Sequence, residues 1–136
     1  MVNVRQATSS GRVRVYRGAA LAAYGFGHGH PFGPDRLDAF WREAQRQGLD
    51  RQVDVCVPVA CSEDDLARFH TRDYIARVRA QSRTGEGYLD YGDTPAFPGV
   101  YQAASHVVSA VLDAVAAILD GKCRRAFVPI AGLHHA

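Results

Sequence analysis

The chain has 136 residues, a hydrophobic content of 47% and a formal net charge of +2. This length suits one domain, or part of one, with a real hydrophobic core. The small net charge and the scattered arginines give no argument for binding to nucleic acid or to a membrane. The polar N-terminus has no apolar signal core. The three cysteines, Cys56, Cys61 and Cys123, fit no zinc-site spacing, so we expect reduced thiols in a cytoplasmic protein.

The first part of the sequence predicts a strand, a loop and a helix. Residues 12–16 alternate polar and apolar side chains, which is typical of a strand. Residues 24–34 contain too many glycines and prolines for regular structure. Within this loop His28 and His30 are candidate metal ligands, but no carboxylate or third histidine accompanies them, and a metal site needs three or four ligands. Residues 34–48 then carry an apolar face with helical spacing.

The middle of the sequence predicts a second strand and two helices. Residues 53–60 are apolar enough for a strand, and Pro58 places this strand at or near a sheet edge. Ser62 and the acidic residues after it form a helix start, which predicts a short helix over residues 63–69. A further helix is expected over residues 74–81.

The clearest predicted helix covers residues 100–119, where apolar side chains follow i, i+3, i+4 spacing and Gly121 provides a C-terminal stop. Ser109 and Asp113 interrupt the apolar run, so we do not expect a membrane span. Apolar side chains occur on both faces, so we expect the helix to be largely buried. His106 is interpreted as an ordinary residue on the face of this helix.

A last apolar run, residues 124–130, predicts a buried strand that leads through Gly132 to His134 and His135. Strands that alternate with helices predict a layered parallel α/β sheet. Ligands bind beyond the carboxyl ends of such strands, and two imidazoles supply a general base and a general acid near neutral pH. The histidine pair is therefore a candidate catalytic pair. The alternative is a surface loop or the remnant of a purification tag.

Several motifs resemble the zinc-dependent histone deacetylase family, which includes acetoin-utilisation proteins and acetylpolyamine amidohydrolases. The sequence Gly132-Leu133-His134-His135-Ala136 resembles the histidine-pair motif of the family, and His30-Pro31-x-x-Pro34-Asp35-Arg36-Leu37 resembles the segment that opens its first long helix. The pattern of residues 57–75, and the aspartate Asp93 before Thr-Pro-Ala, also resemble family segments in the same order. The resemblance implies that residues 1–136 are the N-terminal portion of a single deacetylase-like domain, the first half of an arginase-like fold, with ordered resemblance from about residue 13.

The resemblance also implies roles for individual residues. His134 and His135 are expected to be catalytic, and Asp93 is expected to bind substrate by accepting hydrogen bonds from the backbone of acetyl-lysine. Arg36 and Gly132 are expected at an internal channel behind the active site. Two of these residues have simpler explanations: Asp93 also suits an Asx turn, and Arg36 also suits a surface charge at a helix start.

Two further observations bear on the substrate and on His70. Gly92 stands before Asp93, where relatives that bind peptides often have an aromatic residue, so a small acetylated amine remains an alternative substrate to acetyl-lysine. His70 lies between two predicted helices, and we interpret it as structural.

In the family the zinc ligands and the oxyanion-stabilising tyrosine follow the histidine pair, and this sequence has no residues at those positions. Zinc is therefore an implied cofactor whose ligands are absent from these 136 residues, and no metal ligand is assigned. We expect the chain by itself to be inactive and to leave apolar faces uncovered, notably on the helix over residues 100–119 and on the final strand. Because exposed apolar patches promote association, we also expect it to be marginally stable or to aggregate. The expected function is zinc-dependent deacetylation, in the cytoplasm, without a nucleic-acid or membrane partner. The alternative is a noncatalytic α/β fragment or interaction module.

Overall fold

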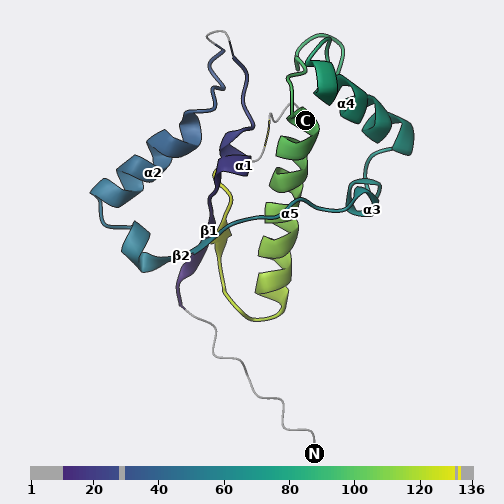
Figure 1. Ribbon diagram of the computed structural model, residues 1–136. Coiled ribbons are helices and arrows are strands. Elements are labelled where there is room, and N and C mark those ends of the chain that lie inside the picture. Colours follow the sequence, from purple (N-terminus) through teal and green to yellow (C-terminus); the bar gives the residue numbers. More distant parts are fainter. Residues whose placement is uncertain (1–10, 28–29, 131, 133–136) are drawn as a thin grey trace, which may run out of the picture.

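The computed structural model describes residues 11–27, 30–130 and 132, and it places three short parallel strands at the centre (Figure 1). These strands are β1 (Val13–Tyr16), β2 (Val53–Cys56) and β3 (Ala126–Phe127). Their order is β2-β1-β3, so the first strand in the sequence lies in the middle. Both pairs are parallel, as the alternation of strands and helices predicts. β2 lies at an edge of the described sheet, where Pro58 favours it.

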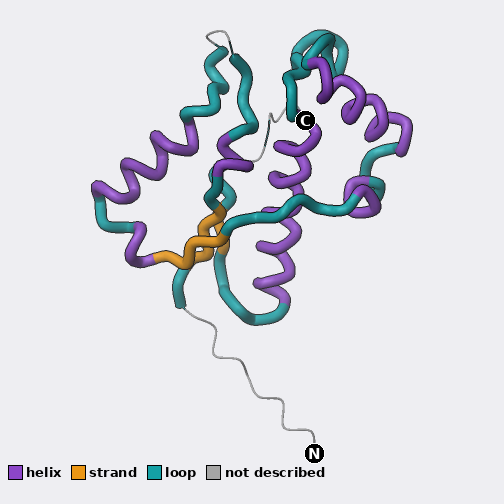
Figure 2. Tube along the Cα trace, in the orientation of Figure 1, coloured by secondary structure: helices purple, strands orange, loops and turns teal. Residues whose placement is uncertain are grey.

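Helices cover the two faces of the sheet (Figure 2). In chain order they are α1 (Ala19–Ala22), α2 (Arg36–Arg46), the 3-10 turn η1 (Asp50–Gln52), α3 (Glu63–Leu66), α4 (Arg72–Thr84) and α5 (Val100–Leu119). In Figure 1, α2 lies on one side of the strands and α5 on the other, with α3 and α4 beyond α5. The predicted α/β fold with a parallel sheet flanked by helices is therefore confirmed.

The alternation of side chains along β1 divides the core into two parts. Val15 packs with Trp41 and Ala44 of α2 on one face of the sheet. Tyr16, the next residue, points to the opposite face and packs with α1 and with Ala110 and Ala114 of α5. The Tyr16 hydroxyl donates a hydrogen bond of 2.5 Å to the Asp113 carboxylate. Burial, followed by this hydrogen bond, raises the pKa of Tyr16 well above its ordinary value. The bond fastens the middle strand to the longest helix.

α5 begins and ends where the sequence predicts, but only one of its faces is buried. The buried face includes Ala103, Val107 and Ala110, whereas Val115 and Leu119 on the outer face are 50% and 80% exposed. The expectation that the helix is largely buried is therefore wrong for this chain, and the expectation of uncovered apolar surface on α5 is confirmed. By length and composition alone α5 would pass as a membrane span, but its buried face forms the core of a layered domain.

The helices around α5 differ from their predicted bounds for local reasons. α3 ends at Leu66 instead of Phe69, because the amides of Phe69 and His70 both bond to the Leu66 carbonyl and close a tight turn. α4 begins at Arg72, before the predicted start, because the Thr71 side chain caps it by accepting a hydrogen bond from the Tyr74 amide.

Candidate functional site

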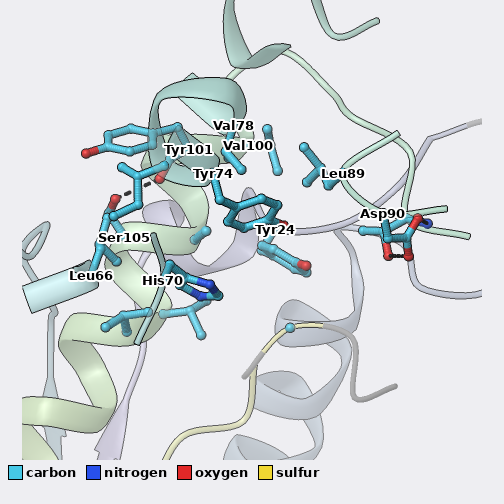
Figure 3. Close-up of a pocket in the computed structure, with 16 residues that line it drawn as sticks. Tyr24, Leu66, His70, Tyr74, Val78, Leu89, Asp90, Val100, Tyr101 and Ser105 are labelled. Atoms are coloured by element: carbon cyan, nitrogen blue, oxygen red, sulfur yellow. Dashed lines mark hydrogen bonds between the residues drawn. The ribbon is translucent and has the colours of Figure 1, made fainter. Parts of the chain in front are cut away.

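A pocket of about 320 Å³ lies between α4, α5 and the loop that joins them (Figure 3). Two of its lining residues, Tyr24 and Gly132, come after the carboxyl ends of β1 and β3 in the chain. Its wall is largely apolar, and the groups that add polar atoms include Tyr24, His70, Tyr74, Asp90 and Thr94. An apolar pocket with a few polar groups at this end of a parallel sheet is the expected place for a ligand.

Gly132 brings the final segment of the chain to this pocket. It lines the pocket together with Tyr24, and its φ of +83° lies in the left-handed region that favours glycine. A Cβ atom at this position would be 3.5 Å from the Tyr24 ring, which is an ordinary contact distance. Glycine is therefore favoured here by the backbone conformation and not by a lack of space. The candidate catalytic residues His134 and His135 lie outside the described residues. That they face a common pocket with Asp93 stays a prediction.

The loop that carries Asp93 is held at its base by backbone hydrogen bonds. Tyr88 and Pro95 form an antiparallel bridge, and the Leu89 amide donates to the Thr94 carbonyl at 2.8 Å. The Leu89 side chain is buried against Ala96 and Val100 at the start of α5. We call residues 88–95 the rim loop, because its base is anchored to α5 and Leu89, Asp90 and Thr94 line the pocket.

The two aspartates of the rim loop are used differently. Asp90 accepts hydrogen bonds from the backbone amides of Gly92, Asp93 and Thr94 at 2.9–3.0 Å, and from the Thr94 hydroxyl at 2.7 Å. These bonds, led by those from Thr94, hold the pKa of Asp90 well below its usual range, so it is ionised near neutral pH. Asp93 lies at the exposed tip of the same loop. Asp90 therefore forms a turn at the tip of the rim loop, three residues before Asp93.

Arg36, the first residue of α2, lies on an aromatic cluster near the pocket. Its guanidinium is 4.7 Å from the centre of the Phe32 ring, and Phe32 is in edge contact with Tyr24 at 5.9 Å. Tyr24 also contacts Phe97, which immediately precedes the turn into α5. Tyr24 is also the pocket residue next to Gly132. The aromatic cluster therefore connects Arg36 to Gly132, the two residues that the resemblance places at an internal channel. Arg36 itself is exposed, so its channel role stays a prediction.

The described histidines occupy local packing positions. His30 accepts a hydrogen bond from the Phe32 amide at 3.0 Å and packs against Phe26. His70 follows α3, and its ring packs between Phe69 and Tyr74 while it lines the pocket. His106 bonds to the Gln102 carbonyl one turn earlier in α5. His28 lies outside the described residues.

Metal-binding groups do not converge in the described part of the chain. Over residues 11–27, 30–130 and 132, no three His, Cys, Asp or Glu side chains form a group that could hold a metal ion. The three cysteines are free, and burial raises the pKa of the Cys56 and Cys61 thiols, so they stay protonated near neutral pH. The described residues therefore do not fit a zinc site, and we assign no reaction step to a metal.

Sequence reasoning missed two residues that shape the pocket. The family motif points to Asp93 and not to Asp90, although an aspartate two residues before a glycine is a recognisable turn signal. The sequence around Tyr24 predicts only an irregular loop. Its burial and its contact with Phe97, more than seventy residues later, depend on tertiary packing that no local pattern reveals.

Comparison with known proteins agrees with this architecture. The family model "Histone deacetylase domain" matches residues 30–136. The acetoin utilization protein AcuC of Bacillus subtilis is 32% identical over 119 residues, which cover 82% of this chain and 31% of that protein. The histone deacetylase RPD3 of Saccharomyces cerevisiae is 27% identical over 133 residues, which cover 92% of this chain and 31% of that protein.

The fold has a close counterpart among solved structures. The HD domain of HDA15 superposes with a TM-score of 0.79 at 19% identity, over 89% of this chain and 36% of that chain. The chain thus spans about a third of the length of the relatives it matches. With a family match over most of its length and the expected order of motifs, the chain belongs to the histone deacetylase family.

Proposed function

We propose that the protein acts as an amidohydrolase that removes acetyl groups from acetyl-lysine or from small acetylated amines. The observation that carries this proposal is the convergence at one pocket of the rim loop and Gly132, two residues before the histidine pair. The relatives named above include a histone deacetylase, which favours an acetylated lysine as one substrate class.

The proposed roles of the residues follow from their chemistry. His134 and His135 act as general base and general acid, because amide hydrolysis requires both a proton acceptor for water and a proton donor for the leaving amine. Asp93 accepts hydrogen bonds from N–H groups of the substrate at the pocket entrance. Arg36 and Gly132 flank an internal channel, in which a guanidinium suits a carboxylate product such as acetate.

We further propose that the activity requires zinc, in keeping with the family. The described residues do not form its site, so its ligands must be sought outside them. Cytoplasmic localisation remains part of the same proposal, because the free cysteines are compatible with a reducing compartment.

One observation favours a second candidate function, a noncatalytic interaction module. The outer face of α5 exposes Val111, Val115 and Leu119, and such apolar surface is typical of binding sites. The two functions are distinguished by assaying the product of the full reading frame that encodes these residues, with and without zinc. The substrates are an acetyl-lysine peptide and an acetylated polyamine. Zinc-dependent turnover of either supports the amidohydrolase, and its absence in a folded, zinc-loaded protein favours the module.

The variant His135→Ala tests the catalytic assignment in the same protein. Turnover should fall by roughly two or more orders of magnitude, the usual contribution of an acid–base residue, while binding of the acetylated substrate changes little. His106→Ala is the matched control, because His106 bonds only within α5. Equal losses of binding and turnover in His135→Ala would show that the pair has a structural role.

A further inference from the structure

The tip of the rim loop depends on Asp90 for its conformation. A single oxygen, Oδ1 of Asp90, accepts from three successive backbone amides, those of Gly92, Asp93 and Thr94. The other oxygen accepts from the Thr94 hydroxyl. Each carboxylate oxygen has about two lone-pair positions, so the three amides share all of Oδ1, whereas Oδ2 keeps one position beside the Thr94 hydroxyl. The Oδ1 atom of Asp90 is therefore fully used by the backbone of the loop.

The base of the loop is fixed by other groups. The Arg77 guanidinium of α4 donates to the Tyr88 carbonyl at 2.6 Å, and the Gln81 side chain donates to the same oxygen at 3.2 Å. With the backbone pairing of Leu89 to Thr94, these bonds hold both ends of the tip independently of Asp90. Removal of the Asp90 carboxylate should thus release the tip without unfolding the loop.

Gly92 allows the chain to turn around the Asp90 carboxylate. Its φ of +122° is open to glycine and rarely adopted by other residues, although no atom lies near the position of a Cβ. The turn places Asp93, one residue later, at the exposed tip. The two aspartates therefore differ in place: the Asp90 carboxylate binds the backbone of the tip, and Asp93 is an exposed residue of that tip.

We propose that Asp90 is a positioning residue for substrate binding, which fixes the backbone of Asp93 before a substrate arrives. The inference rests on the proposed function, in which Asp93 accepts hydrogen bonds from the acetylated substrate. A preordered acceptor binds without the entropy cost of ordering the loop, so loss of Asp90 weakens substrate binding and leaves the chemical step unchanged.

The test compares Asp90→Ala, Asp90→Asn and Thr94→Val in the product of the full reading frame, with zinc and an acetyl-lysine peptide. Asp90→Ala should raise KM about tenfold with kcat within about twofold, the pattern of lost uniform binding. Asp90→Asn should restore KM, because its amide oxygen accepts the three backbone bonds and its NH₂ donates to the Thr94 hydroxyl. Thr94→Val loses one of the four bonds to Asp90, so its KM should lie between the KM values of Asp90→Asn and Asp90→Ala. Glu86→Gln is the control, because it removes a negative charge from the neighbouring loop without altering the Asp90 bonds.

Two additional measurements separate failure of this inference from failure of the proposed function. Amide hydrogen exchange of Gly92, Asp93 and Thr94 reports the tip directly, and Asp90→Ala should speed it whether or not the protein turns over substrate. Unchanged exchange would overturn the positioning role. In an active enzyme, a raised KM in Asp93→Ala with an unchanged KM in Asp90→Ala would overturn it as well. An unchanged KM in Asp93→Ala would instead refute the proposed role of Asp93.

Discussion

Replacing Gly25 with alanine should destabilise the protein, because the loop that leads into α2 closes tightly on this residue. A Cβ atom at position 25 would lie 2.7 Å from the Pro34 nitrogen and 2.8 Å from the Gly33 carbonyl carbon. Both are backbone atoms, so the contact cannot be relieved by turning a side chain. The two segments of the loop must move apart, and with them the aromatic cluster on which Arg36 lies.

The expected magnitude follows from measured costs of overpacking. Forcing additional atoms into a closely packed site costs about 1–3 kcal/mol in the free energy of unfolding. Gly27→Ala is the matched control in the same loop, because among the described residues no atom outside its chain neighbours lies within 4 Å of the added Cβ. The control should be neutral or more stable by up to about 1 kcal/mol, since alanine restricts the unfolded chain.

Urea denaturation provides the assay. Trp41 is the only tryptophan and is 7% exposed in the core between α2 and β1, so its fluorescence reports unfolding of the central layers. Gly25→Ala should unfold at a clearly lower urea concentration than Gly27→Ala, with an unchanged slope. Equal midpoints for the two variants would refute the reasoning, because they would mean that the loop widens at no cost.

Three further predictions concern other parts of the structure. Tyr16→Phe should lower stability at neutral pH by about 1 kcal/mol, because the bond to Asp113 is lost. Because the pKa of Tyr16 is raised in the folded state from an ordinary 10.0, its contribution is complete below pH 10 and is lost as the pH rises above 10. In urea titrations above pH 10, the free energy of unfolding of the wild-type protein should thus fall faster than that of Tyr16→Phe, by up to about 1.4 kcal/mol per pH unit. Parallel plots of unfolding free energy against pH would contradict the assignment. Ser62→Ala should cost about 1 kcal/mol in thermal or urea unfolding, because the Ser62 side chain caps α3, whereas Ser62→Asn should retain most of the stability. Leu119→Lys should reduce self-association of the 136-residue chain in sedimentation experiments, because Leu119 is 80% exposed on the apolar outer face of α5. The free energy of unfolding should change by less than about 0.5 kcal/mol. Undiminished association would place the contact between chains elsewhere.

The sequence allowed the longest elements to be predicted well and the shortest poorly. α5 was predicted with its observed bounds, because twenty residues of regular apolar spacing end at a glycine with φ of +71°. The sequence predicts the third strand over residues 124–130, but the strand pairs only at Ala126 and Phe127, opposite Arg14 and Val15 of β1. α1 was missed, since four residues beside a glycine-rich loop carry no periodic signal.

The candidate site was predictable to the extent that its residues follow local motifs. The positions of Arg36 at a helix start and of Asp93 in a rim loop agree with the expected segments. The packing of Tyr24 against Phe97 arises from tertiary structure, and the convergence of three backbone amides on one oxygen of Asp90 arises from loop geometry. Neither leaves a period or a spacing in the sequence, and so neither was predicted.

The order of the strands has a consequence for biosynthesis. β1 is made first, yet its partner β3 begins at Ala126, more than a hundred residues later. At a synthesis rate of about 5–20 residues per second, the middle strand waits on the order of ten seconds for its second neighbour. During that time the Arg14 and Val15 backbone presents an unpaired edge, and unpaired edges attract other chains. The nascent chain is therefore most exposed to aggregation, and to capture by chaperones, in the interval before β3 emerges.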